Sequence, residues 1–208
     1  MLRLYDFLES GNGYKVRLLL TQLGLPFERV ELDITKGQTR TPEFLAKNPN
    51  GRIPTLELPD GRFLAESNAI IFHLAEGSRF LPADRFERAL VLQWMFFEQY
   101  SHEPNIATAR FVMHFIPPDD ERRQGLPGMT KRGYEALDVM ERHLSTRSHF
   151  VGDRYSIADI ALYAYTHVAH EGGFDLGRYP KIRAWLDRVA AEPRHVAMDQ
   201  QPAAAAAE

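Results

Sequence analysis

Hydrophobic and polar residues at the start of the chain follow two different periods. Residues 2–7 and 27–32 predict two short strands. Between them, residues 14–23 place leucine and valine side chains on one helical face, and Gly24 followed by Pro26 ends that helix. A strand, a helix and a strand in this order predict a right-handed crossover between two parallel strands.

A proline-led strand and a tight turn follow further along the chain. Residues 53–58 predict a strand that is entered through Pro54, because proline cannot donate to the ladder of a sheet and belongs at a strand's first residue or at an edge. Asp60 and Gly61 turn the chain, and residues 62–64 return antiparallel to the strand before them.

Two helices flank this hairpin. The first covers residues 42–48 and has Thr41 as its N-cap. The second begins with the acid Glu66 and the hydroxyl of Ser67 and continues through apolar residues. The exposed N–H groups and the positive dipole end of such a helix favour a bound anion. On its own, this pattern is equally consistent with an ordinary capped helix after a hairpin that binds no ligand.

The rest of the chain is helical in its periodicity. Residues 79–85 are turn residues without a period and form a linker. Beyond the linker, apolar residues recur at helical spacing, and Glu103-Pro104 interrupts or kinks the first long segment. The expected helices cover residues 86–102, 105–115, 130–144 and 180–192.

One further helix start carries a strong local signal. Ser156 as N-cap and Asp159 at the third helical position form a capping box, and Tyr155 and Ile160 stand at the positions of a hydrophobic staple. This pattern predicts a helix that begins after Ser156.

The order of elements predicts two domains. Residues 1–78 give an α/β domain with the thioredoxin-like order βαβ-α-ββα, and residues 86–208 give an all-α domain. The final residues 200–208 are expected to be a frayed tail.

Composition limits the chemistry. The 208 residues are 44% hydrophobic and 25% charged, and a formal net charge of −3 gives no electrostatic reason to expect nucleic acid or an anionic membrane as partner. No apolar run approaches the ~18 residues of a membrane span, and charged residues interrupt the N-terminus where a signal peptide would be apolar. The histidines are scattered, so no metal site is expected. We expect a cytoplasmic protein.

The chain contains no cysteine. Disulfides, thiolate metal sites and a cysteine nucleophile are therefore excluded. Any thiol chemistry must use a small-molecule thiol.

The loop between the first strand and the first helix is the first candidate for chemistry. Ser10 and Asn12 lie there, at the carboxyl end of a strand, where ligands bind in open α/β sheets. The loop contains neither of the two glycine-rich motifs that bind phosphate, GxGxxG and the motif that ends in Gly-Lys-Ser/Thr. Both residues also favour helix N-caps, so capping and chemistry are both open.

Three motifs, in this order, resemble those of the cytosolic glutathione transferases, and the loop resembles that of their bacterial serine/asparagine branch. They are the turn Arg52-Ile53-Pro54, the helix start Glu66-Ser67 and the capping box at Ser156. The resemblance extends over nearly the whole chain and implies glutathione as a co-substrate. It also implies a homodimer.

The resemblance assigns roles in glutathione binding to residues of the first domain. It implies a cis bond before Pro54 and pairing of the Ile53 backbone with the cysteinyl part of glutathione, in the turn that Arg52 opens. It implies that Glu66 and Ser67 hold the γ-glutamyl amine and carboxylate. Another residue, Gln38, corresponds to a glutamine that reaches the glycyl end.

The resemblance leaves the group that activates the thiol open. Ser10 is the first candidate, Asn12 is a close second, and Tyr5 is the rival because other classes use a tyrosine of the first strand. The helical domain is expected to line the site of a small hydrophobic electrophile. Its polar candidates are Tyr100, Asn105, Arg110 and His114.

Three functions agree with these residues. The first is a glutathione transferase that attacks a hydrophobic electrophile. The alternatives are a glutathione-dependent disulfide reductase and a non-catalytic protein that binds glutathione or another ligand, because a fold does not fix a function.

Overall fold

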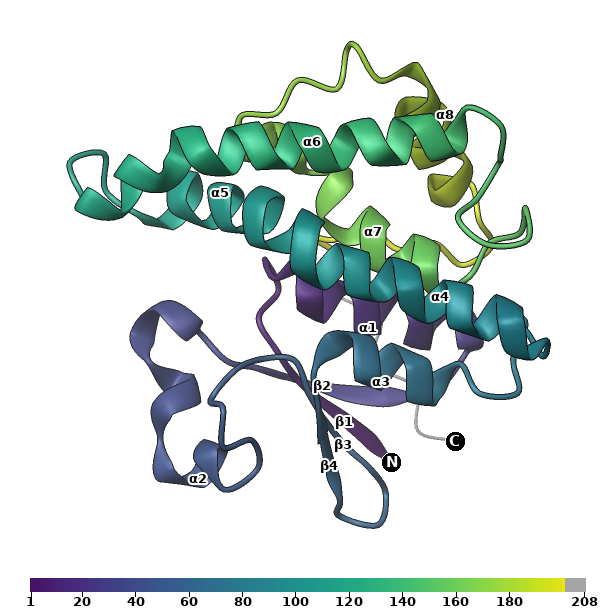
Figure 1. The fold of residues 1–208 in the computed structure, drawn as a ribbon. Coiled ribbons are helices and arrows are strands. Elements are labelled where there is room, and N and C mark those ends of the chain that lie inside the picture. The colour runs from purple at the N-terminus through teal and green to yellow at the C-terminus, as the bar shows by residue number, and fades with distance from the viewer. Residues whose placement is uncertain (201–208) are drawn as a thin grey trace. The chain divides into compact units, whose positions relative to one another are not determined.

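The computed structural model describes residues 1–200, which form two compact units (Figure 1). One unit contains residues 1–78 and 193–200, and the other contains residues 79–192. The structure thus differs from the expected domain that runs from residue 86 to 208, because residues 193–200 pack with the first unit. Most of the tail that was expected to be frayed, residues 201–208, lies outside the described residues.

A four-stranded sheet with the order β2-β1-β3-β4 forms the centre of the first unit. The pair β1 and β2 is parallel, and β3 is antiparallel to both β1 and β4. The expected strand–helix–strand crossover and hairpin are therefore confirmed. The strands are β1 (Leu2–Asp6), β2 (Phe27–Glu31), β3 (Thr55–Glu57) and β4 (Phe63–Ala65).

Helices α1 (Gly11–Leu23) and α3 (Ser67–Leu74) pack against each other in this unit, and α2 (Pro42–Leu45) is a single short turn. The helix α1 begins three residues earlier than its apolar period, because Ser10 caps it and Gly11 continues from the cap. Its C-terminus at Gly24 adopts φ 70°, which glycine reaches without steric cost. Side chains without solvent exposure form the core: Leu4, Val16, Leu19, Leu20, Leu56, Ile70 and Ile71.

The long elements of the second unit are all helices. A single π-helical turn, Glu98–His102, separates α4 from α5 at the place where Pro104 was expected to interrupt or kink the chain. The helix α6 begins before its expected start at residue 130, because a 3-10 turn at Glu121–Gly125 leads directly into it. The helices are α4 (Arg85–Phe97), α5 (Glu103–Phe115), α6 (Leu126–Leu144), α7 (Ile157–Thr166) and α8 (Pro180–Ala190).

The capping box is confirmed and extends into the core. The Asp159 carboxylate accepts from the Ser156 N–H at 2.9 Å and closes the box. It also accepts from Trp185 Nε1 at 2.9 Å and from the Phe150 N–H at 3.3 Å. Burial raises the pKa of Asp159, which has no solvent exposure. One carboxylate therefore connects α7 to α8 and to the loop before α7.

Replacing Asp159 should be costly for this unit. The variant Asp159→Ala leaves buried donors, among them Trp185 Nε1, without an acceptor, and each such group costs ~1–3 kcal/mol. We expect the unfolding free energy in urea to fall by about 3 kcal/mol or more. The control Asp84→Ala removes a solvent-exposed N-cap that accepts from Phe86 and Glu87 at 2.9 Å, and should cost only ~1 kcal/mol. Equal losses for the two variants would contradict this role of Asp159.

Candidate functional site

The register of the sheet brings three predicted site segments to one place. Thr55 of β3 pairs with Tyr5 of β1 on one side and with Ala65 of β4 on the other. The preceding residue, Pro54, is therefore level with the end of β1 and with Glu66, which precedes α3. The Ile53–Pro54 bond is cis, as the resemblance implied. The loop after β1, the proline turn and the start of α3 thus meet at one end of the sheet.

Ser10 and Asn12 occupy the loop side of this corner. The Ser10 hydroxyl oxygen accepts from the Gly13 N–H at 3.3 Å, so Ser10 caps α1. The Asn12 Oδ1 accepts from the Ser67 hydroxyl at 3.1 Å. This contact joins the first turn of α1 directly to the first residue of α3.

A residue of this corner that the sequence analysis did not single out is Lys15. Its side chain has no solvent exposure, and its Nζ lies 3.5 Å from both Ser67 Oγ and Asn68 Oδ1. A lysine in a helix usually reaches solvent, which is why its charge carried no signal. The spacing was the only sign in the sequence, because residues 12 and 15 are neighbours on one helical face.

A buried ion pair supports the loop from β1. Asp6 Oδ2 lies 2.8 Å from Arg17 Nε, and neither side chain is exposed. The same guanidinium donates to Leu8 O at 2.6 Å and to Met198 O at 2.8 Å. Burial raises the pKa of Asp6 to about 6 although the charge of Arg17 acts to lower it. The pair therefore holds both the loop that leads to Ser10 and the C-terminal segment.

Glu66 and Ser67 form the helix side of the corner. Glu66 is the N-cap residue of α3. Its backbone has φ 68° and ψ 111°, a conformation that residues other than glycine rarely adopt. Strained residues of this kind persist at binding sites, where the surrounding structure holds them. The Glu66 side chain is exposed, whereas Ser67 is 5% exposed and faces Asn12.

The remaining predicted glutathione contacts have different environments. Ile53 N–H and C=O form no hydrogen bond with any other described residue, so both backbone groups remain available for a ligand. Arg52 is exposed beside them. Gln38 is exposed, and its Oε1 accepts from the Asp33 N–H at 2.7 Å, which closes its loop.

Tyr5 is engaged elsewhere. Its hydroxyl donates to Glu57 Oε2 at 2.7 Å, and Arg3 contacts the same carboxylate at 3.3 Å. Burial and, after it, the bond to Glu57 raise the pKa of Tyr5. A phenol that gives its one proton to a neighbouring carboxylate is poorly suited to donate to a bound thiolate.

The polar candidates of the helical unit divide into two pairs. Asn105 and Arg110 are buried: Asn105 Oδ1 accepts from Arg132 at 2.9 Å, and Arg110 Nε lies 2.6 Å from Glu171. These contacts give both residues structural roles within their own unit. Tyr100 is 87% exposed and His114 is also exposed.

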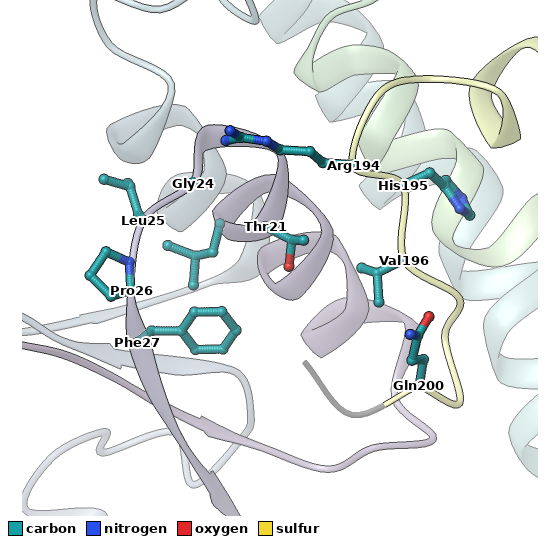
Figure 2. Close-up of a pocket in the computed structure, with 10 residues that line it drawn as sticks. Thr21, Gly24, Leu25, Pro26, Phe27, Arg194, His195, Val196 and Gln200 are labelled. Carbon is teal, nitrogen blue, oxygen red and sulfur yellow. The ribbon is translucent and has the colours of Figure 1, made fainter. Parts of the chain in front are cut away.

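A cavity of about 490 Å³ lies at the opposite end of α1 (Figure 2). Thr21 and Phe27 line it from one side, and Arg194, Val196 and Gln200 line it from the C-terminal segment. Because Ser10 and Asn12 are at the N-terminus of α1, this cavity is separate from the corner described above.

Residues 1–200 contain no group of three or more histidine, aspartate or glutamate side chains placed to hold a metal ion. Within the same residues, no helix has the length and apolar character needed to cross a membrane.

Comparison with known proteins identifies a family over most of the chain. Residues 1–76 match the N-terminal domain of glutathione S-transferases, and residues 104–193 match the C-terminal domain of the same family. The disulfide-bond oxidoreductase YfcG of Escherichia coli (strain K12) is 33% identical over 204 residues, covering 93% of this chain and 92% of that protein.

Solved structures agree over the same extent. The crystal structure of a glutathione S-transferase from Pseudomonas fluorescens superposes with a TM-score of 0.92 at 59% identity, covering 95% of this chain and 98% of that one. Ure2p in complex with glutathione superposes with a TM-score of 0.83 at 25% identity, covering 93% and 90% of the two chains.

The close approach of α1 to β1 can be tested at Gly13. A Cβ at this position would overlap Asp6 Oδ1, and Asp6 cannot turn away without breaking its ion pair with Arg17. We expect Gly13→Ala to lower the thermal midpoint by several degrees, the shift of a ~1–3 kcal/mol overpacking loss. In the control Gly128→Ala, the new Cβ would lie 3.4 Å from the flexible end of Arg132, and the midpoint should hold or rise. An unchanged midpoint for Gly13→Ala would refute the constraint.

Proposed function

Because the chain belongs to the glutathione S-transferase family, we propose that it binds glutathione as a co-substrate and activates the thiol for attack on a small hydrophobic electrophile. The observation that carries this proposal is the 3.1 Å contact between Ser67 and Asn12. It joins two segments with proposed roles in glutathione binding and activation, next to the cis bond at Pro54.

Each part of glutathione has a complementary group in this corner. The exposed Glu66 carboxylate suits the γ-glutamyl amine. The backbone N–H groups at the start of α3, where Ser67 is the first residue, suit the γ-glutamyl carboxylate. The backbone N–H and C=O of Ile53 suit the cysteinyl backbone, as in an added strand.

The glycyl end of glutathione is the part whose proposed partners are most exposed to solvent. We assign it to the amide nitrogen of Gln38 and to the positive charge of Arg52, because both side chains are exposed. Exposed partners contribute little affinity, since water competes for them. These two residues should therefore contribute less to binding than the buried start of α3 at Ser67 does.

The sulfur needs hydrogen-bond donors, because a free thiol has a pKa of ~8.5 and only the thiolate is strongly nucleophilic. The Ser10 oxygen accepts from Gly13, and its own proton remains to be donated. The Asn12 amide has two N–H donors, and its oxygen is already occupied by Ser67. The N-terminus of α1 adds a favourable dipole.

In the transferase reaction, the thiol proton passes to solvent and the thiolate attacks an electrophilic carbon. A carbon–sulfur bond forms, and the electron pair of the broken bond leaves with the displaced group. Exposed Tyr100 and His114 are the candidates for contact with the hydrophobic substrate. Asn105 and Arg110 have less support, because they are buried in their own unit.

Disulfide reduction is the second candidate, and the similarity to a disulfide-bond oxidoreductase favours it. Since the chain has no cysteine, two glutathione molecules must supply the electrons. The first thiolate attacks the disulfide, releases one thiol and forms a mixed disulfide. The second glutathione thiolate attacks the glutathione sulfur of this mixed disulfide, giving oxidised glutathione and the second thiol.

We also propose, as expected from the sequence, a homodimer in the cytoplasm with no nucleic acid or membrane as partner. Light scattering at micromolar concentration tests the dimer independently of activity.

Two substrates separate the candidate functions. We expect turnover of chloronitrobenzene with glutathione if transfer is the main reaction. Turnover of hydroxyethyl disulfide alone would instead establish the reductase. Formation of a thiolate, seen by its ultraviolet absorbance when glutathione is added, distinguishes both enzymes from a protein that only binds the ligand. Absence of both turnover and thiolate would overturn the proposed activity.

The group that activates the thiol is tested by the pH profile of turnover. A hydrogen bond to a charged group is worth ~1.5–3 kcal/mol, so its loss should raise the pKa of the bound thiol by about one to two units. We expect this shift for Ser10→Ala and Asn12→Ala, with glutathione affinity nearly kept. Tyr5→Phe is the matched control and should leave the profile in place, because its hydroxyl binds Glu57. A shift for Tyr5→Phe alone would contradict the assignment.

A further inference from the structure

Three polar groups form a continuous chain behind the proposed sulfur site. Lys15 Nζ lies 3.5 Å from Ser67 Oγ, and Ser67 Oγ lies 3.1 Å from Asn12 Oδ1. Lys15 has no solvent exposure, and Ser67 has 5%. Water therefore has little access to the middle of the chain, where the Ser67 hydroxyl contacts both of the other groups.

The chemistry of the donors sets the direction of this chain. An ammonium group has three donors and no acceptor, so the Ser67 oxygen must accept from Lys15. Ser67 has one proton, which it turns away from the ammonium and donates to Asn12 Oδ1. A neutral amide at position 12 could otherwise present either its oxygen or its nitrogen to Ser67.

We propose that Lys15 is a positioning residue that fixes the orientation of the Asn12 amide through Ser67. The amide oxygen of Asn12 is held on Ser67, and its N–H donors are directed to the side where the glutathione sulfur binds. This inference rests on the proposed function and adds to it a residue that need not touch either substrate. The contact of Lys15 with Asn68 Oδ1 at 3.5 Å holds the ammonium in place against α3.

A structural role alone makes a different prediction. If Lys15 only ties α1 to α3, its loss lowers stability and leaves the pKa of the bound thiol unchanged. If it orients Asn12, its loss lets the amide turn its oxygen toward the sulfur, which disfavours the thiolate. The effect must then disappear when Asn12 is absent.

The test is a titration of the bound thiol at saturating glutathione, followed by its ultraviolet absorbance. We expect Lys15→Met to raise the thiol pKa by about one unit, which is tenfold less thiolate below that pKa. In the Asn12→Ala background, Lys15→Met should cause no further shift. Lys15→Arg should restore part of the effect, and the exposed control Lys131→Met should behave like the unmodified chain.

A second variant keeps the inference testable if Lys15→Met fails to fold. Ser67→Ala breaks the same chain with a smaller change, and it should also raise the thiol pKa only when Asn12 is present. A shift that persists without Asn12, or a thiolate that forms with an unchanged pKa in Lys15→Met, would overturn the inference while leaving the proposed function intact. If the unmodified chain forms no thiolate, the proposed function fails and the inference fails with it.

Discussion

The buried contact among Asp6, Gly13 and Arg17 is the constraint on which the N-terminal corner depends. Asp6 ends β1, and its carboxylate occupies the space that a side chain at residue 13 would fill. Arg17 compensates that buried charge at 2.8 Å. Removing one partner from such a pair typically costs ~3–5 kcal/mol, because the other charge is left uncompensated. The approach of α1 to β1 is therefore held by charge as well as by apolar packing.

The same helix carries a second buried cation that points elsewhere. Lys15 and Arg17 are two residues apart, which places them on different faces of α1. Arg17 contacts the loop after β1 and the C-terminal segment, and Lys15 contacts the start of α3. One helix turn thus supports the Ser10 loop from one side and the Asn12–Ser67 contact from the other.

Periodicity and turn chemistry were sufficient for most of the fold. The β1–α1–β2 crossover, the hairpin after Pro54 and the Ser156 capping box follow from local patterns, and the structure confirms them. The strand register then brings the site segments together, because Thr55 of β3 pairs with β1 on one side and with β4 on the other. The return of residues 193–200 to the first unit was missed, since it depends on long-range hydrogen bonds from Tyr14 and Arg17 to backbone carbonyls.

The direction in which a single side chain points could not be predicted from the sequence. A strand pattern cannot tell whether the Tyr5 hydroxyl faces a ligand or a neighbouring strand, and its partner Glu57 is distant in sequence. Polar residue types in a helix predict exposure, so the burial of Lys15 and Asn105 could not be read from them. Both are buried because a partner on another element accepts their hydrogen bonds or donates to them.

In the proposed function, the corner of the first unit activates a thiol and does not choose its target. A thiolate held by Ser10 and Asn12 can attack carbon or sulfur, and the two reactions differ only in the group that leaves and in the need for a second glutathione. The donors at the sulfur are the same in both. Relatives of one fold can therefore carry different activities. What selects between transfer and reduction must lie outside the corner that makes the thiolate, in residues that bind the second substrate.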